Sequence, residues 1–247
     1  MVGAAPPPAL LPWTVGIVVP ARNEEALIGR CLEALAVAVT RLHEVAPGCV
    51  VDIVVVLDSC TDRTAERVAQ FPGVRTVSTD VGTVGGARAL GVASVTERIC
   101  DPRGVWIACT DADSAPPPDW LVGQLTIAEQ GHALVAGVVY VDPDDPDLPR
   151  ELVHAVEESH SGIPDGHEQV HGANLGFTLQ TYLDVGGFAP VPAHEDVLLV
   201  GRARSHGVPS FATGALPVLT SARLDARAPE GFSAWLREQQ PREDLAS

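Results

Sequence analysis

The stretch "GVWIACTDADSAPPP" (104–118) places two carboxylates directly after a run of residues suited to burial. Val105 to Cys109 is apolar, the run ends at Thr110, and Asp111 and Asp113 follow one residue apart. Two like charges this close each raise the cost of ionising the other. A turn or a helix cap would also explain an Asp-x-Asp, so the elements around the pair decide its meaning.

The apolar run before the pair is one of several expected strands. Short runs rich in β-branched residues predict strands at 15–19, 50–57, 74–77, 105–110 and 133–141. Helical spacing of apolar residues, with caps and Pro-Gly stops, predicts helices at 27–42, 61–70, 85–99 and 119–130. Continuous apolar strands that alternate with helices indicate a mostly parallel, Rossmann-like sheet sandwiched by helices. The expected fold class is therefore α/β.

The pattern changes beyond Asp142. The segment DPDDPDLP (142–149) is an acidic loop broken by prolines, and the remainder mixes short elements with loops. We expect a single domain with a nucleotide-type half at residues 13–113 and a more irregular half at residues 114–240. Residues 1–12 and 241–247 are expected to be flexible termini.

Polar residues follow three of the expected strands at the point where each strand ends. The segment from Pro20 to Glu24 follows the first strand, Asp58 ends the second, and Asp111 and Asp113 follow the fourth. Because ligands bind outside the carboxyl ends of parallel strands, these groups are expected to converge on one edge of the sheet. Mg²⁺ and Mn²⁺ bind one or two carboxylates together with substrate phosphates. The aspartate pair is therefore predicted to hold a metal ion and a diphosphate.

Charge and cysteine content narrow the function further. Thirty-two acidic residues face sixteen arginines and no lysine, and a net charge of −16 argues against nucleic acid or an anionic membrane as partner. The five scattered cysteines, without a C-x-x-C, suit a reducing compartment. The segment MVGAAPPPALLPW (1–13) lacks the basic start of a signal peptide, and no apolar run reaches the roughly 20 residues of a membrane span. We expect a cytoplasmic protein.

Five segments, in the right order, resemble glycosyltransferase family 2, whose members have a GT-A fold. VVPARNEE (18–25) resembles the opening nucleotide-binding segment of the family, VVVLDSCTDRT (54–64) its second-strand motif, and TDAD (110–113) its metal-binding D-x-D. HGANLGF (171–177), with VGGF (185–188), is similar to the segment lining the sugar and acceptor site. HEDVLLVGRARSHG (194–207) resembles the helix that carries the catalytic base. The resemblance covers most of the chain, from about Val15 to Leu236.

The resemblance implies an inverting, metal-dependent glycosyltransferase that moves a single sugar from a nucleoside-diphosphate sugar, expected to be UDP-linked, to a hydroxyl acceptor. Residues 13–113 would bind the donor, and residues 114–240 the acceptor. The implied nucleotide-sugar-binding residues are Pro20, Ala21, Asn23, Glu24, Asp58, Arg88 and Asp111. Asp111 and Asp113 would hold Mg²⁺ or Mn²⁺, and Asp196, beside Glu195, would be the catalytic base. The residues implied at the sugar and acceptor site are Gly172, Ala173, Asn174 and His194.

Two departures from the family pattern bear on this function. The arginine- and tryptophan-containing motif of processive members is absent, which favours transfer of one sugar over polymer synthesis. Many relatives supply a third metal ligand, often a histidine, late in the chain. This sequence has no histidine after Gly207, so the segment PVLTSARLDAR (217–227) leaves that ligand unassigned.

Other functions stay open on the sequence. His167-Glu168-x-x-His171 is the H-E-x-x-H signature of zinc hydrolases, with Glu195 as a conceivable third ligand, but flanking Pro and Gly leave barely one helical turn. GTVGGARALG (82–91) does not fit the dinucleotide fingerprint, because it follows the third strand and not the first. A nucleotidyltransferase, or a non-catalytic nucleotide-sugar-binding module, would use the same kind of sheet. Asp196 alongside a D-x-D argues for a catalyst.

Overall fold

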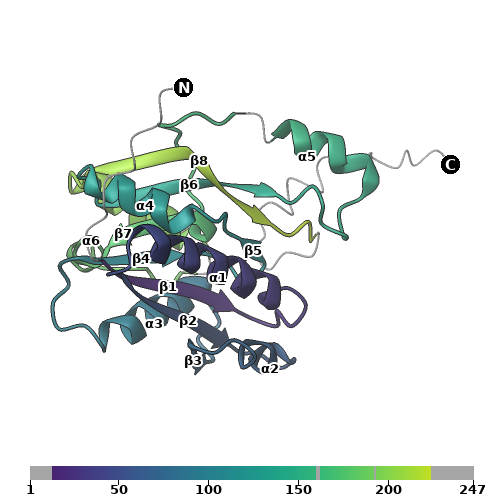
Figure 1. The fold of residues 1–247 in the computed structure, drawn as a ribbon, viewed down its shortest axis with the longest axis horizontal. Helices are drawn as coiled ribbons and strands as arrows, with labels where there is room; N and C mark the ends of the chain where they lie inside the picture. The colour runs from purple at the N-terminus through teal and green to yellow at the C-terminus, as the bar shows by residue number, and fades with distance from the viewer. Residues whose placement is uncertain (1–12, 160–161, 192, 224–247) are drawn as a thin grey trace.

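A single eight-stranded sheet forms the centre of the described part of the chain (Figure 1). The computed structural model describes residues 13–159, 162–191 and 193–223. The strands are β1 (Thr14–Ala21), β2 (Val50–Asp58), β3 (Val74–Thr79), β4 (Val105–Cys109), β5 (Ser114–Ala115), β6 (Leu134–Val141), β7 (Leu175–Thr178) and β8 (Ser210–Thr220). Their order across the sheet is β3-β2-β1-β4-β7-β6-β8-β5. The predicted termini at 1–12 and 241–247 lie outside the described residues.

The sheet is mixed, with most neighbouring strands parallel. β1 pairs in parallel with β2 and β4, β2 with β3, and β6 with β8. β7 is antiparallel to β4 and β6, and the two-residue β5 is antiparallel to β8. Thr14 is in register with both Val50 and Val105, so β1, β2 and β4 begin side by side and run in the same direction. This parallel core is the one the sequence predicts.

Helices cover both faces of the sheet (Figure 1). The helices are α1 (Ile28–Val45), α2 (Thr64–Val68), α3 (Val84–Thr96), α4 (Trp120–Glu129), α5 (Val153–Ser159), α6 (Leu179–Asp184) and α7 (Glu195–Ser205), with short 3₁₀ turns η1 (Arg150–Leu152) and η2 (Gly172–Asn174). One hydrophobic cluster joins α1, α2 and α4 to one face, and a second joins α3, α6 and α7 to the other. The α/β sandwich predicted from the strand–helix alternation is confirmed.

Local sequence explains how the two longest of these helices pack. In α1, the buried residues Ile28, Cys31, Leu32 and Leu35 recur at three- and four-residue spacing and form one apolar stripe. In α3, Gly91 lies against the first strand, since a Cβ at this position would approach Val18 Cγ1 to 2.3 Å. The glycine therefore allows α3 to lie close to the sheet, and this closeness brings the start of α3 near the polar edge.

The second half of the chain is more regular than the sequence predicts. β7, β8 and β5 extend the sheet of the first half, where we expected loops and short elements. β8 is hard to recognise because its register shifts opposite the segment between Gly137 and Val139, and Gly214 and Pro217 interrupt its apolar pattern. Beyond β6, α5 packs in a small separate cluster with Leu148, Leu152 and Ala222. Among the described residues, no helix is both long and apolar enough to cross a lipid bilayer.

Candidate active site

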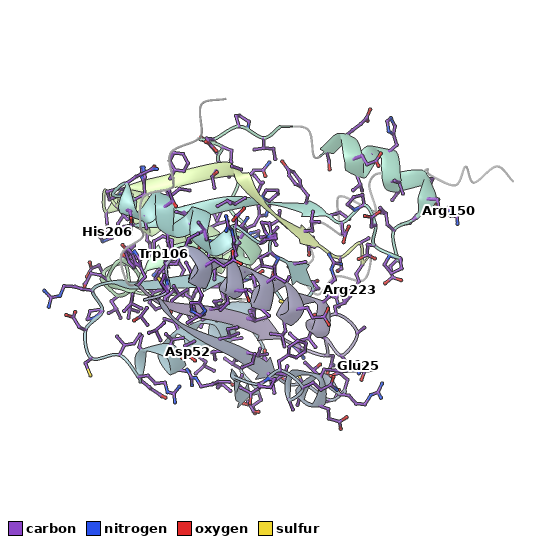
Figure 2. The ribbon with its side chains drawn as sticks, viewed as in Figure 1. Glu25, Asp52, Trp106, Arg150, His206 and Arg223 are labelled. Atoms are coloured by element: carbon purple, nitrogen blue, oxygen red, sulfur yellow. The ribbon has the colours of Figure 1, made fainter. Side chains whose placement is uncertain are left out.

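The carboxyl ends of β1, β2 and β4 lie at the same edge of the sheet, as their shared direction requires. Most of the residues predicted to bind the donor follow these ends. Glu25, after β1, and Arg223, after β8, lie on this side of the molecule in Figure 2, whereas Asp52 lies farther back along β2. The predicted convergence of the strand-end residues is therefore present in the fold.

The loops after β1 and β2 are tied together by polar contacts. Asn23 has a left-handed backbone (φ 52°), and its Oδ1 accepts hydrogen bonds from the backbone N–H of Thr61 (2.7 Å) and of Asp62 (3.4 Å). The backbone N–H of Glu24 donates to Oγ1 of Thr64 at 2.7 Å. Ala21 accepts a weak hydrogen bond from Sγ of Cys60 at 3.3 Å. Asn23 thus shapes the loop, and its predicted contact with the nucleoside stays a prediction.

Asp58 is fixed at the end of β2. Its side chain is almost fully buried, and its Oδ1 accepts hydrogen bonds from the backbone N–H of Gly82 (3.0 Å) and from Ser59 Oγ (3.1 Å). Ser59 itself has a left-handed backbone with φ of 54°. These contacts link the loop before α3 to the second strand and hold the carboxylate in one orientation at the predicted nucleoside position.

Arg88 joins the first carboxylate of the pair to the helix that carries the predicted base. Its guanidinium binds Asp111 Oδ1 at 2.5 Å and also pairs with Glu195, the first residue of α7. Burial disfavours charge on Arg88, but Asp111 and Glu195 outweigh it and raise the arginine pKa. Desolvation raises the pKa of Glu195 and of Asp111, and Arg88 opposes both shifts. Arg88 was predicted to reach the phosphate or base. In the structure it is buried and connects Asp111 to Glu195.

Asp113 is surrounded by donors, three from the end of β8 and the residues after it and one from its neighbour Ser114. Its Oδ2 accepts from Arg223 Nη2 at 2.5 Å and from Ser221 Oγ at 3.3 Å. Its Oδ1 accepts from Ser114 Oγ at 3.3 Å and Thr220 Oγ1 at 3.4 Å. Sequence reasoning did not identify Arg223 as a site residue. Arg223 lies within segment 217–227, in which the sequence left the expected third metal ligand unassigned.

Arg223 also binds Glu24 with both arms of its guanidinium. Nη1 donates to Glu24 Oε2 at 2.9 Å, and Nη2 donates to Oε1 at 3.1 Å. Burial opposes the charge of Arg223, while the hydrogen bonds and charges of Glu24 and Asp113 raise its pKa overall. Glu24, predicted to contact the nucleoside, is therefore first of all the partner of this arginine.

The predicted base lies where the two halves meet. Asp196 Oδ2 accepts from the backbone N–H of Gly172 at 2.7 Å, and its Oδ1 accepts from the N–H of Val197 at 2.8 Å. His194, just before α7, turns the chain with a left-handed backbone (φ 64°). A Cβ on Gly172 would come within 2.3 Å of Arg88 Nη1. Asp196 is therefore held next to the Arg88 link and the loop that precedes β7.

Two predicted acceptor residues, Asn174 and Ala173, are buried. Asn174 is 1% exposed, its Oδ1 accepts from Trp120 Nε1 at 2.8 Å, and its Nδ2 donates to the carbonyls of Val138 (2.8 Å) and Leu216 (2.7 Å). These contacts join α4, β6 and β8. The amide of Asn174 thus holds these elements together, and its predicted role at the acceptor stays a prediction.

The zinc-hydrolase alternative fails on local structure. Residues 163–171, which contain His167, Glu168 and His171, form a turn and irregular backbone, whereas the zinc motif requires both histidines on one face of a helix. Within the described ranges, no group of three or more His, Cys, Asp or Glu side chains is placed to hold a metal ion. The H-E-x-x-H match is a coincidence of sequence.

The pair Asp111 and Asp113 fits a divalent metal as a two-carboxylate site. Mg²⁺ and Mn²⁺ commonly take one or two protein carboxylates and complete their coordination with water and substrate phosphate, so a third protein ligand is not required. The Arg223 guanidinium already places a positive charge on Asp113, which shows that this position favours a cation. The residues present are therefore compatible with a metal ion that binds together with a diphosphate.

Carboxylates at the ends of parallel strands, with a further carboxylate opening a helix across the edge, define the site of a GT-A type glycosyltransferase. The family model for glycosyl transferase family 2 matches residues 16–177, and the chain belongs to this family. The match ends at β7, so α7 and Arg223 lie beyond it. A search of curated proteins gave no match.

Solved structures share the fold at low sequence identity. S. aureus TarS (residues 1–349) with UDP-GlcNAc is 14% identical over 85% of this chain and 59% of that chain, with a TM-score of 0.60. Mannosyltransferase PcManGT from Pyrobaculum calidifontis, with GDP-Man and Mn²⁺, is 20% identical over 94% and 61%, with a TM-score of 0.61. Glucosyl-3-phosphoglycerate synthase from Mycobacterium tuberculosis, with Mn²⁺, UDP and glucosyl-3-phosphoglycerate, is 22% identical over 85% and 73%, with a TM-score of 0.56. The chain thus spans less than two thirds of the length of the first two.

Proposed function

We propose that this protein is an inverting, metal-dependent glycosyltransferase that moves one sugar from a nucleoside-diphosphate sugar to a hydroxyl acceptor. The observation that carries the proposal is the link from Asp111 through Arg88 to Glu195, which fixes the donor edge relative to the helix that carries Asp196 in its first turn. A base and a diphosphate site must keep a set separation for in-line transfer, and a buried ion-paired link maintains it.

The donor is proposed to lie along residues 13–113, with its nucleoside near Asp58 and its diphosphate near Asp111 and Asp113. Pro20, Ala21 and Asn23 would line the nucleotide along the loop after β1. The structures of similar fold were solved with UDP-GlcNAc, with UDP and with GDP-Man, so the fold accepts both nucleotides. We propose a UDP-linked donor, on the family resemblance of the second-strand motif.

Asp111 and Asp113 are the residues proposed to hold Mg²⁺ or Mn²⁺. A divalent ion at this position supplies Lewis-acid stabilisation of the charge that develops on the leaving diphosphate. Two structures of similar fold contain Mn²⁺ with a nucleotide or nucleotide sugar, which supports the proposal.

The proposed reaction is a single displacement. The acceptor oxygen forms a bond to the anomeric carbon, the bond from that carbon to the diphosphate oxygen breaks, and the electron pair leaves with the nucleoside diphosphate. Asp196 takes the hydroxyl proton, since a hydroxyl is a poor nucleophile until a base removes it. Attack from the face opposite the leaving group inverts the anomeric configuration. Glu195, paired with Arg88, positions the helix.

The acceptor is proposed to enter between α7 and the loop before β7, within residues 114–240. Gly172 and His194 border Asp196 and would shape this entrance. The nature of the acceptor is set by loops in this half, because specificity within a fold comes from the connecting segments. We place the protein in the cytoplasm, in line with its five cysteines, all of which are free.

Replacing the proposed base tests the function. Asp196→Asn keeps an acceptor oxygen for the N–H of Gly172, so the fold and donor affinity should persist while turnover falls by roughly 10²–10⁴-fold. Asp184→Asn, at an exposed position of α6, is the matched control and should keep full turnover. The product, followed by NMR, should have the anomeric configuration opposite to that of the donor. Near-normal turnover in Asp196→Asn or retained configuration would contradict the mechanism, and absence of turnover in the wild type with all donors would favour a binding module.

A further inference from the structure

Arg223 occupies the position at which a metal ion would meet Asp113. It follows β8, and Figure 2 shows it on the same side of the molecule as Glu25, which follows β1. Its Nη2 lies 2.5 Å from Asp113 Oδ2, one of the oxygens the proposed metal site needs. The other contacts of Asp113 come from hydroxyl groups at 3.3–3.4 Å, so the guanidinium is its closest partner.

A guanidinium and a divalent cation cannot share this oxygen without strong repulsion. Two positive charges a few ångströms apart at a partly buried site repel by several kcal/mol in a protein environment. The side chains of Arg223 and Asp113 are 29% and 20% exposed, so solvent screens the repulsion only in part. Arg223 must therefore leave Asp113 before a metal ion can bind there.

Glu24 is a second anionic partner for Arg223. Nη1 and Nη2 of Arg223 contact Glu24 at 2.9 and 3.1 Å, and Nη2 is shared with Asp113, so the Nη1 contact does not depend on Asp113. Glu24 is itself fixed, because its side chain is 7% exposed and its backbone N–H is bound to Thr64. A small rotation on this anchor would free Asp113 and keep the positive charge of Arg223 at the same edge, facing a donor diphosphate.

We propose that Arg223 is a built-in competitor of the metal ion: it neutralises Asp113 before the donor arrives, and it gives up this carboxylate only when metal and diphosphate bind together. The proposal rests on the proposed donor site. It follows that the free protein binds divalent metal weakly, because the metal must displace a paired cation. A diphosphate offsets the free energy of displacing Arg223, because it adds oxygen ligands to the metal and gives the released guanidinium an anionic partner. Metal and nucleotide then bind with positive coupling.

Metal binding in the absence of nucleotide tests the competition directly. Mn²⁺ is titrated into wild-type protein and Arg223→Gln, and free Mn²⁺ is measured by its electron paramagnetic resonance signal. We expect Arg223→Gln to bind Mn²⁺ about tenfold or more tightly than the wild type, within the usual range of such coupling. Arg223→Lys, which keeps the charge but loses the two-armed contact, should give a smaller gain. Arg41→Gln, which removes an exposed arginine paired with Glu44 and Asp119, changes net charge equally and should leave Mn²⁺ affinity unchanged.

The same titration with saturating UDP separates this proposal from the proposed function. With UDP, the difference in Mn²⁺ affinity between wild type and Arg223→Gln should shrink, because the diphosphate gives the released guanidinium of the wild type an anionic partner, and the variant has no guanidinium to displace. Equal Mn²⁺ affinity of the two proteins without UDP, while wild type binds UDP with Mn²⁺, would overturn the competition alone. UDP that binds equally well with and without Mn²⁺, or that does not bind at all, would overturn the proposed metal–donor site and the competition with it.

Discussion

The two aspartates of the pair are two residues apart, yet each is neutralised by an arginine in a different environment. Asp111, whose own side chain is 37% exposed, is paired with Arg88, whose side chain is 3% exposed and also binds a nearly buried glutamate. Asp113 is paired with Arg223, whose side chain is 29% exposed. We call these the inner pair and the outer pair. The inner pair links α3 to α7, and the outer pair lies at the open edge after β8.

Because Arg88 is buried and Arg223 is partly exposed, the two pairs differ in how easily they can open. Arg88 and Glu195 are both nearly buried, so removing one of them leaves an uncompensated charge away from water and costs several kcal/mol. Arg88 is therefore held in place in the folded protein, although Asp111 itself is partly exposed. A partly exposed pair can open, because water takes over the hydration of its charges. One aspartate of the D-x-D is thus held for structure, and its neighbour can exchange partners. Four substitutions test this contrast.

The largest effect is expected at the inner pair. Arg88→Met keeps much of the side-chain volume but leaves Asp111 and Glu195 without their cation, so the free energy of unfolding should fall by about 3–5 kcal/mol. Urea denaturation followed by circular dichroism measures this loss. Arg41→Met, at an exposed ion pair, should change stability by less than about 1 kcal/mol. A loss at Arg88 as small as the loss at Arg41 would show that the inner pair is not structural.

A methyl group added next to Arg88 of the inner pair should have the next largest effect on stability. Gly172→Ala places a Cβ within 2.3 Å of Arg88 Nη1 and within 2.5 Å of its Cζ. Because Arg88 is held by two carboxylates, it cannot move aside without loss, and overpacking of this kind costs about 1–3 kcal/mol. Gly201→Ala, inside α7 with open space around its Cα, should instead stabilise the helix by about 0.5–1 kcal/mol. Equal melting temperatures for the two variants would disprove the close approach.

The outer pair should contribute less to stability than the inner pair. Arg223→Gln should lower the free energy of unfolding by about 1–2 kcal/mol, between the values for exposed and buried pairs. Added salt screens partly exposed charges, so the difference from wild type should narrow between low and high ionic strength. Denaturation at two salt concentrations provides the measurement. A loss as large as that of Arg88→Met would mean that the outer pair is equally fixed.

The smallest expected effect is on the pH dependence of stability, and it comes from His171, which precedes Gly172 next to the inner pair. Desolvation lowers the pKa of His171, against an opposing effect of Asp196, so the unfolded chain binds a proton more readily than the fold does. His171 therefore destabilises the protein as pH falls from the ordinary histidine pKa of about 6.5 toward its lower folded value. His171→Gln should lose stability less steeply than wild type in this window. Parallel slopes for the two proteins would show that His171 does not titrate differently in the fold.

The site residues that follow β1, β2 and β4 were predictable, because these strands are continuous apolar runs. The ends of β1, β2 and β4 are readable from β-branched residues, and parallel strands bring their ends to one edge. The loop tied by Asn23 and the position of Asp58 follow from that placement. The sequence also identified Glu195 and Asp196 at the start of a helix, from the resemblance to the family.

The residues that escaped prediction depend on contacts between distant segments. Arg223 meets an aspartate 110 residues earlier, and no local pattern records such a contact. The hydrogen bonds of the buried Asn174 amide with Trp120 and two strands were not predicted either, because its motif resembles an acceptor loop and shows no sign of them. β8 was missed because Gly214 and Pro217 interrupt it. Each of these is a case in which tertiary packing, and not local sequence, determines the outcome.

The position of β8 has a consequence for the order in which the protein is made. Its parallel pairing with β6 and its hydroxyl and guanidinium contacts to Asp113 come from residues that leave the ribosome roughly a hundred positions after the D-x-D. Chains are synthesised from the N-terminus, and a domain generally folds as a unit. Until β8 is added, a nascent chain carries an unpaired edge on β6 and lacks the outer cation beside Asp113 and Glu24. The arrival of one late strand therefore covers the edge of β6 and completes the proposed donor site at the same time, so a chain released early would lack both.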